Sequence, residues 1–312
     1  MVTLEDINVA QTRISPFIHR TPIYTCNSLN KLTGAKLYFK CDNFQKAGSF
    51  KIRGATNTVL QLSPEELNHG VITTSSGNHG AALALAATKQ GADVQVVMPN
   101  NTSRIKIQNV ERYGGKIIYC EPNHESRENT LKEMVERTGA IVVHPYNDER
   151  IVAGQGTAAN ELLTDLSSLD AIISPVSGGG LLCGTLLAAK GIDSNIKVYG
   201  AEPMGADDTY RSIQEGRIVP NKRVDTIADG LRAQVGTITF PIIQEMVDEI
   251  IPVSEETIID SMRMIWERLK IMVEPSSSIV LGGLLSKKEV FNNKKVGLIL
   301  SGGNVDLDNI PW

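Results

Sequence analysis

The chain has 312 residues, of which 41% are hydrophobic and 21% are charged, and its formal net charge is -4. This composition is typical of a globular protein long enough for about two domains. The slight acidic excess excludes a basic surface that would attract nucleic acid or anionic lipid. No apolar run approaches the roughly 20 residues that a membrane helix needs. We therefore expect neither a nucleic-acid partner nor a membrane.

The N-terminal stretch MVTLEDINVAQTRISPF predicts a short amphipathic helix with Leu4, Ile7 and Ile14 on one face. It contains acidic residues and no apolar core, so neither a signal peptide nor a transit peptide is expected. The cysteines of the chain have no CxxC spacing, which is typical of reduced thiols in a cytoplasmic protein. They are Cys26, Cys41, Cys120 and Cys183.

From about residue 70, predicted strands alternate with predicted helices. The strands are GVITTS, DVQVVMP, KIIYC and AIVVHP, and the helices between them are HGAALALAATKQG, SRIKIQNVERYGG and ESRENTLKEMVERTG. Strands that alternate with helices of about 10–15 residues indicate crossover connections and a parallel sheet.

The same alternation returns after Asp148. A helix over about 151–167 is followed by the strand DAIISPV, the helix LLCGTLLAAKG and the strand IKVYGAE, and the last strand is KKVGLILSGGN. We predict an α/β fold with two open, mostly parallel sheets, each buried by helices on both faces. Residues 70–147 are expected to form a small domain, and residues 1–69 and 148–312 a large one. A site between them would lie near Lys51, Ser76 and Ser177.

Residues 44–55, FQKAGSFKIRGA, contain one lysine that directly follows an aromatic residue and a Gly-Ser step. On this stretch alone, a basic surface turn is the simpler interpretation of Lys51, because most lysines are solvated. The alternative is a reactive lysine, and the loops described next favour it.

Two glycine-containing loops connect a predicted strand to a predicted helix. SSGNHGA, residues 75–81, suits a carboxylate or phosphate at a helix N-terminus, although a simple connection capped by Asn78 or Ser76 has the same pattern. PVSGGGLLCG, residues 175–184, has three consecutive glycines, which cost backbone entropy and favour a main chain wrapped around a phosphate. It matches neither G-x-G-x-x-G nor a Walker loop, so a nicotinamide cofactor is not supported.

A third loop, LSGGNVD at residues 300–306, ends the last strand, where Ser301 could direct its hydroxyl into a ligand crevice. The chain shows no Ser-His-Asp order, no His/Cys metal cluster and no paired carboxylates of obvious spacing. A lysine combined with a phosphate-binding loop favours pyridoxal phosphate, which forms a Schiff base with lysine.

Six motifs together resemble the serine racemase and serine/threonine dehydratase family, which belongs to the fold type II, tryptophan-synthase-β-like pyridoxal-phosphate enzymes. They are FQKAGSFKIRGA, TTSSGNHGAALALAA, SGGGLLCG, GAEPMGADD, DTIADGLR and LSGGNVDL, and the resemblance runs from Ile14 to Leu307. PYNDERIVAGQGT and PVSGGG look most like plant-type and microbial serine racemases. The resemblance implies a two-domain fold with the cofactor in the interdomain cleft, and a homodimer.

The resemblance also implies roles for single residues. Lys51 would form the internal aldimine, Asn78 would bond the phenolic oxygen of the ring, and Ser301 would meet the pyridine nitrogen. Phe50 and Gly230 would flank the ring. The phosphate would be held by Ser177, Gly178, Gly179, Gly180 and Leu181.

For the substrate, the resemblance implies a carboxylate site made of Ser75, Ser76, Asn78 and His79. Arg127 matches a position that reaches toward bound dicarboxylates. Lys51 would take the Cα proton on one face and Ser76 would stand on the other face. Reprotonation by Ser76 gives racemisation, whereas loss of the β-hydroxyl gives a keto acid and ammonia. A neutral Ser301 suits these outcomes better than transamination.

EPMGADD contains Glu202, the carbonyl of Ala206 and Asp208, which are hard oxygen ligands that suit Mg2+ or Ca2+. The resemblance implies that they form a cation site, because the family binds a divalent cation with matching residues. The alternative is an acidic helix N-terminus stabilised by the helix dipole. ATP activation is not expected, because Ala47 and Ala81 stand where nucleotide-activated racemases carry polar residues. The chain stops at Trp312, so isoleucine feedback is not expected either.

The preferred prediction is a serine racemase with L-serine and L-threonine dehydratase activity. A close alternative is a 3-hydroxyaspartate ammonia-lyase, in which Arg127 would bind the second carboxylate. A non-catalytic ligand sensor on the same fold is a third possibility, against which Lys51, Ser76 and Ser301 argue. The sequence does not rank serine, threonine and hydroxyaspartate.

Overall fold

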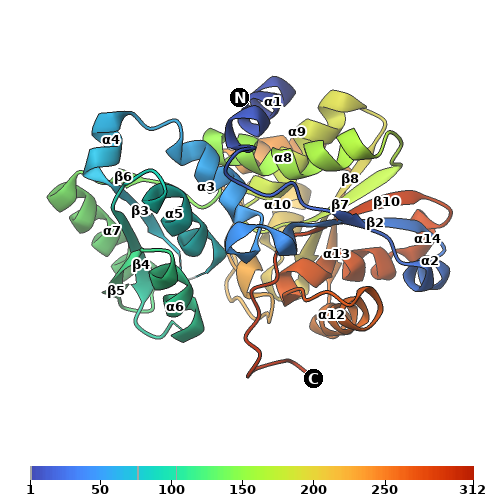
Figure 1. Cartoon of the computed structure of the whole chain (residues 1–312). Coiled ribbons are helices and arrows are strands. Elements are labelled where there is room, and N and C mark those ends of the chain that lie inside the picture. Colours follow the sequence, from blue (N-terminus) through green and yellow to red (C-terminus); the bar gives the residue numbers. More distant parts are fainter. Residues whose placement is uncertain (1, 76, 103) are drawn as a thin grey trace.

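The computed structural model describes residues 2–75, 77–102 and 104–312, and within them the strands form two sheets (Figure 1). The six-stranded sheet has the order β1-β2-β10-β7-β8-β9 and the four-stranded sheet the order β5-β4-β3-β6, counted over these described residues. Only β1 pairs antiparallel there, with β2. The predicted α/β class with two mostly parallel sheets is confirmed.

The strand bounds are as follows. The larger sheet contains β1 (Ile23–Tyr24), β2 (Lys36–Cys41), β7 (Ala171–Pro175), β8 (Lys197–Pro203), β9 (Glu249–Val253) and β10 (Lys295–Leu300). The smaller sheet contains β3 (Val71–Thr74), β4 (Val94–Pro99), β5 (Lys116–Cys120) and β6 (Ile141–Val142).

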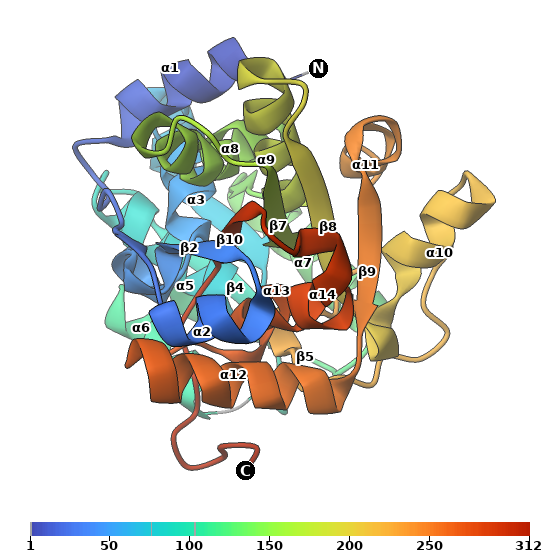
Figure 2. The same cartoon turned by 90° about the vertical axis from the view of Figure 1, so that its right-hand side faces the viewer.

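Helices cover both faces of the larger sheet. On one face lie α1 (Leu4–Ile14), α8 (Glu149–Asp165), α9 (Gly180–Ile192) and α11 (Thr239–Met246), and on the other lie α2 (Asn27–Thr33), α12 (Glu255–Leu269), α13 (Pro275–Ser286) and α14 (Lys288–Phe291). Figure 2 shows α8 and α9 on the opposite side of the strands from α12.

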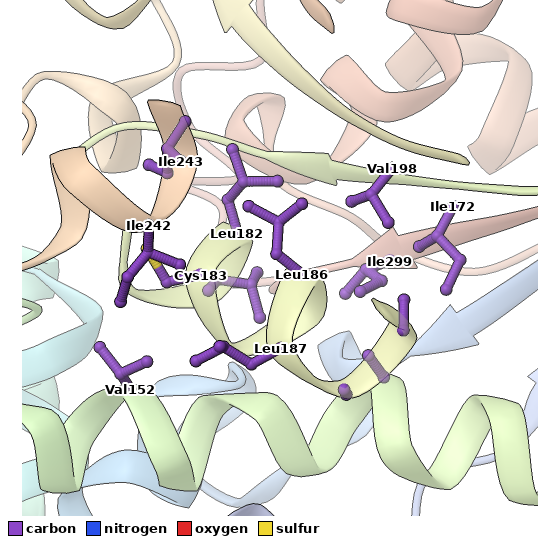
Figure 3. Packing of buried hydrophobic residues seen from close by; sticks show 14 of the residues in the cluster. Val152, Ile172, Leu182, Cys183, Leu186, Leu187, Val198, Ile242, Ile243 and Ile299 are labelled. Carbon is purple, nitrogen blue, oxygen red and sulfur yellow. The ribbon is translucent and has the colours of Figure 1, made fainter. Parts of the chain in front are cut away.

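The two cores of this sheet follow from the alternation of side chains along each strand. Ile172 belongs to the core under α8 and α9, and its neighbour Ile173 belongs to the core under α12 and α13. Figure 3 shows Leu182 and Leu186 of α9 close to Val198 in the first of these cores. A strand buried on both faces reads as a continuous apolar run, as DAIISPV does.

The smaller sheet is covered by α5 (Asn78–Thr88) and α6 (Arg104–Arg112) on one face and α7 (His124–Thr138) on the other, with α4 (Pro64–His69) at its β6 edge. The helix α3 (Lys51–Val59) packs on α5 and on α8. Ile52 of α3 shares a core with Val94 and Val96 of β4. This core therefore includes residues outside 70–147, and the predicted domain boundaries stay a prediction.

Two element ends differ from the predicted ones for local reasons. The helix predicted over about 151–167 runs from Glu149 to Asp165, because the Asp148 side chain accepts the Arg150 N–H and caps its start. The predicted strand AIVVHP is a strand only over Ile141–Val142. Its continuation turns at His144, whose ring nitrogen accepts two backbone N–H groups.

The remaining elements are α10 (Asp208–Glu215) and the short 3-10 helices η1 (Asp42–Phe44), η2 (Lys46–Gly48), η3 (Met204–Ala206) and η4 (Asp229–Leu231). The strand β9 and the helices α12 and α13 were not predicted from the sequence. None of the helices in the described part of the chain has the length and apolar character that crossing a membrane requires.

Candidate active site

Lys51 is the first residue of α3, and its side chain is partly buried. Lys51 Nζ donates a hydrogen bond to the Pro145 carbonyl oxygen at 2.8 Å and lies 5.2 Å from the centroid of the Phe50 ring. Burial lowers the pKa of the Lys51 amine to about 8. An amine of this pKa is partly unprotonated near neutral pH and is therefore available as a base or nucleophile.

The segment 144–147 holds the Pro145 carbonyl in place. His144 Nδ1 accepts the backbone N–H groups of Tyr146 at 3.2 Å and Asn147 at 2.8 Å. Burial, followed by the charge of Lys51, lowers the pKa of His144 to about 4. The ring therefore stays neutral, as an acceptor nitrogen must.

The glycine loop lies directly against this segment. A Cβ atom on Gly178 would come within 2.3 Å of Tyr146 Cδ1, so only glycine fits beneath the ring. Gly179 has a φ of +92°, and a Cβ there would lie 2.7 Å from Thr239 Oγ1. Gly180 then begins α9, and Leu181 is buried behind it.

The backbone N–H groups of the glycine loop are free to bind a phosphate, but the Ser177 hydroxyl is not. Among the described residues, the backbone N–H groups of Gly178, Gly179 and Gly180 have no hydrogen-bond partner, which suits an anion at a helix N-terminus. The Ser177 hydroxyl donates to the Ala233 carbonyl at 2.9 Å and accepts the Ala233 N–H at 3.0 Å. A hydrogen bond from that hydroxyl to a phosphate would require these two hydrogen bonds to break.

Three segments carrying predicted cofactor residues meet at Glu274, which the sequence analysis missed. Asn78 Nδ2 donates to Glu274 Oε1 at 2.8 Å. Cβ atoms built on Gly302 and Gly230 would lie 2.6 Å and 4.0 Å from the same oxygen. Next to Gly302, the Ser301 carbonyl accepts the Phe50 N–H at 2.9 Å. Phe50, Asn78, Gly230 and Ser301 are thus brought into one cluster.

The loop predicted to receive the substrate carboxylate begins α5. Ser75 Oγ accepts the N–H groups of Gly77 at 3.3 Å and Gly80 at 3.1 Å. His79 Nε2 lies 3.2 Å from the Val143 carbonyl oxygen, while its Nδ1 is buried without a partner among the described residues. Burial, with the charge of Lys51, lowers the pKa of His79 to about 3, so this ring is neutral. Ser76 lies outside the described residues.

Arg127 is not joined to this cluster by any hydrogen bond or ion pair within the described residues. It lies on α7, and its buried Nε has no partner there. An unpartnered guanidinium nitrogen retains the capacity to bind a carboxylate.

The predicted cation ligands lie at the start of α10. Glu202 accepts the N–H groups of Thr209 at 3.0 Å and Tyr210 at 2.8 Å, as the capping alternative predicts. Asp208 accepts the Asn221 amide and the Val235 N–H, both at 2.8 Å. Burial, and then the nearby Asp208 charge, raises the pKa of Glu202 to about 8.

These two buried carboxyl groups repel each other, so a cation between them would relieve the repulsion. No group of three or more His, Cys, Asp or Glu side chains suited to a metal occurs in the described ranges. Any ion here would therefore depend on the Ala206 carbonyl and water to complete its ligands.

Comparison with known proteins identifies the family. The profile of the pyridoxal-phosphate dependent enzymes matches residues 14–302. The chain belongs to the pyridoxal-phosphate dependent enzyme family. It is 48% identical to a serine racemase of Dictyostelium discoideum over 99% of this chain and 97% of that protein. It is 46% identical to a beta-hydroxyaspartate dehydratase of Paracoccus denitrificans (strain Pd 1222) over 99% and 98%, respectively.

The fold is likewise that of this pyridoxal-phosphate family. The structure of maize serine racemase superposes with a TM-score of 0.97 at 46% identity, covering 98% of this chain and 95% of that one. The predicted family resemblance is confirmed. The individual residue roles are not tested by these likenesses and stay predictions.

The described residues fit pyridoxal phosphate. Its phosphate matches the three unpartnered N–H groups of the glycine loop, and its aldehyde matches the partly buried amine of Lys51. Sequence reasoning found these parts through motifs. It missed Glu274, whose only local signal is an acidic residue directly before Pro275 at the start of α13.

Proposed function

We propose that this chain is a serine racemase that also acts as an L-serine and L-threonine dehydratase, with pyridoxal phosphate as its cofactor. The observation that carries the proposal is the partly buried Lys51 amine, which donates to the Pro145 carbonyl and lies 5.2 Å from the centroid of the Phe50 ring. The full-length identity of 48% to a serine racemase supports this reaction.

Lys51 would hold the cofactor covalently, and the N–H groups of Gly178, Gly179 and Gly180 would hold its phosphate. Asn78 would donate to the phenolic oxygen, and Ser301 would face the pyridine nitrogen. When bound, pyridoxal phosphate acidifies the Cα–H of the amino acid joined to it by drawing the electron pair into its ring.

The two faces of the substrate then need two proton carriers. Released from the cofactor, Lys51 Nζ accepts the Cα proton on its own face, for which a pKa near the working pH is suited. Ser76 would return a proton on the other face, which inverts Cα. If the β-hydroxyl leaves before the proton returns, water is lost, and hydrolysis gives a keto acid and ammonia.

A 3-hydroxyaspartate ammonia-lyase is the second candidate, and Arg127 favours it. Its buried Nε has no partner within the described residues, so it has a donor to offer the second carboxylate of such a substrate. The 46% identity to a beta-hydroxyaspartate dehydratase supports the same candidate.

We also propose Mg2+ or Ca2+ at Glu202, Ala206 and Asp208, a homodimer in solution and a location in the cytoplasm. The mutual repulsion of the two carboxyl groups supports the cation, and four free, buried cysteines suit a reducing compartment. Light scattering after size-exclusion chromatography tests the dimer, and cell fractionation tests the location.

One substrate panel tests the activity. The protein, reconstituted with pyridoxal phosphate, is given L-serine, D-serine, L-threonine and 3-hydroxyaspartate, and keto acid and both enantiomers are measured together. We expect D-serine and pyruvate from L-serine. Turnover of 3-hydroxyaspartate alone would select the second candidate. Cofactor binding with no product from any substrate would indicate a ligand sensor.

A further inference from the structure

The side-chain amide of Asn78 is held from both ends. Asn304 Nδ2 donates to the Ala47 carbonyl and to Asn78 Oδ1, each at 2.8 Å. An amide NH2 group has two protons, so Asn304 has used both. On the other side, Asn78 Nδ2 gives one proton to Glu274 Oε1 at 2.8 Å. One Nδ2 proton of Asn78 is left to donate.

The first anchor, Asn304, is itself fixed by the backbone around Ala47. Ala47 has a φ of +57°, a conformation that non-glycine residues rarely adopt and that is often retained for function. A Cβ on Gly48 would lie 2.2 Å from Asn304 Oδ1, so glycine is needed to seat the amide. The loop therefore presents Asn304 with its NH2 group toward Asn78.

The second anchor is Glu274, whose carboxyl group is buried, and burial disfavours the charged form of a carboxyl group. It is 4% exposed, and it caps no backbone N–H of the helix that it precedes. The charged groups facing it are Asp229 and Lys106, which also pair with each other at 2.5 Å. A buried carboxyl group without a capping role needs another reason to be retained.

We propose that Glu274 and Asn304 are positioning residues that fix the Asn78 amide so that it offers an N–H, and not its oxygen, to the cofactor. The inference rests on the proposed function, in which Asn78 donates to the phenolic oxygen. A flipped amide has almost the same shape, so packing alone does not select its orientation. An acceptor on one side and a donor on the other do select it.

The test compares Glu274→Met with Glu274→Gln in the protein reconstituted with pyridoxal phosphate. Methionine fills the space but accepts no hydrogen bond, whereas glutamine keeps an acceptor oxygen for Asn78. The readouts are the dissociation constant of pyridoxal phosphate and the visible absorption band without substrate. We expect Glu274→Met to weaken cofactor binding about tenfold, the usual scale for one lost hydrogen bond, and to diminish the visible band.

Glu274→Gln is expected to recover affinity to within about threefold of the wild-type protein. Ser286→Ala, at the far end of α13, is the matched control and leaves both readouts unchanged. Asn304→Asp replaces the donor with an acceptor at constant shape, so it should reproduce the Glu274→Met effect. It also decides the question if Glu274→Met does not fold.

Wild-type affinity and spectrum in both Glu274→Met and Asn304→Asp would overturn the positioning role. Equal defects in Glu274→Gln and Glu274→Met would also overturn it, because an acceptor oxygen for Asn78 would then not be what the cofactor site requires. A wild-type protein that takes up no pyridoxal phosphate would instead overturn the proposed function, and this inference with it.

Discussion

Arg53 Nε lies 2.6 Å from Asp42 Oδ2, and both side chains are fully buried. Arg53 is on α3, the helix that begins with Lys51. Arg53 Nη1 also lies 2.8 Å from Glu161 Oε1, and Lys40 Nζ lies 2.6 Å from the other oxygen of that carboxylate. Burial alone would raise the pKa of Asp42, but the Arg53 guanidinium holds it below its usual range. These ion pairs fasten α3 to α8, β2 and η1.

Breaking this network is expected to cost far more than breaking a surface ion pair. Arg53→Met removes the shared cation and leaves two buried carboxylates, which typically costs about 3–5 kcal/mol of unfolding free energy. Arg20→Ala, which breaks the exposed pair with Asp165, is the control and should cost less than about 1 kcal/mol. Urea unfolding monitored by circular dichroism measures both. Similar losses of unfolding free energy in the two variants would contradict the expectation that the buried ion pairs contribute more than the exposed pair.

Lys51→Ala is expected to abolish covalent attachment of pyridoxal phosphate and nearly all turnover. The Lys51 amine combines a partly buried position with a pKa of about 8. Borohydride reduction followed by peptide mapping locates the attachment. Lys46→Ala is the control from the same motif, because Lys46 Nζ bonds the Phe17 carbonyl instead. A cofactor label on any lysine other than Lys51 would contradict Lys51 as the attachment site.

Removal of divalent cations is expected to lower both activity and melting temperature. An ion that binds only the folded protein stabilises it by about 2.7 kcal/mol at a hundredfold excess over its Kd. Mg2+ or Ca2+ should restore the wild-type protein but not Asp208→Asn. Asp207→Asn is the adjacent control, because Asp207 pairs with Arg211 at 2.7 Å. Identical melting curves with chelator and with excess Mg2+ would count decisively against the site.

Glu274 is expected to make stability fall as the pH rises. Burial, followed by the Asp229 charge, raises the pKa of this carboxyl group to about 8. A group whose folded-state pKa is raised stabilises the protein fully below its unfolded pKa and loses that contribution as the pH passes the folded value. The melting temperature of the wild-type protein should therefore fall relative to Glu274→Gln as the pH rises from about 4.5 to about 8. Melting-temperature curves of the wild-type protein and Glu274→Gln that stay parallel over this pH range would contradict the raised pKa of Glu274.

Local patterns were enough to predict the parts of this molecule that lie close together in sequence. The alternation of strands and helices gave the two sheets, and the glycine runs gave the loop beneath Tyr146. The hydrogen bond between Asn78 and Glu274 joins positions 196 residues apart, so no local pattern reports it. The same is true of the Pro145 carbonyl beside Lys51, since a backbone acceptor has no sequence signature.

Other differences between the predicted and the observed structure arise because a polar side chain forms hydrogen bonds that no sequence pattern indicated. The hydroxyl of Ser177, a residue predicted to help hold the phosphate, is engaged by the backbone of Ala233. The His144 ring ends the strand β6 early by accepting two N–H groups. In each case, the need to satisfy a polar group in the interior overrode the local pattern.

Ser76 carries the last prediction, which rests on the sequence because Ser76 lies outside the described residues. Only one face of a substrate held by the cofactor can meet Lys51, so we expect L-serine to present its Cα–H there and D-serine to present the opposite face. A serine hydroxyl is a weak base at its ordinary pKa, and the cofactor phosphate or a lysine must assist it.

Ser76→Ala is therefore expected to keep much of the L-serine-to-pyruvate activity but to lose racemisation in both directions and D-serine elimination. Ser75→Ala is the control, because Ser75 Oγ holds the N–H groups of Gly77 and Gly80 and its loss loosens the loop for both reactions alike. The measurement is pyruvate release from each enantiomer, with chiral chromatography of the remaining serine. Since both variants remove one oxygen, the ratio of racemisation to elimination separates a proton carrier from a structural hydroxyl. Wild-type racemisation by Ser76→Ala would mean that another residue serves the second face.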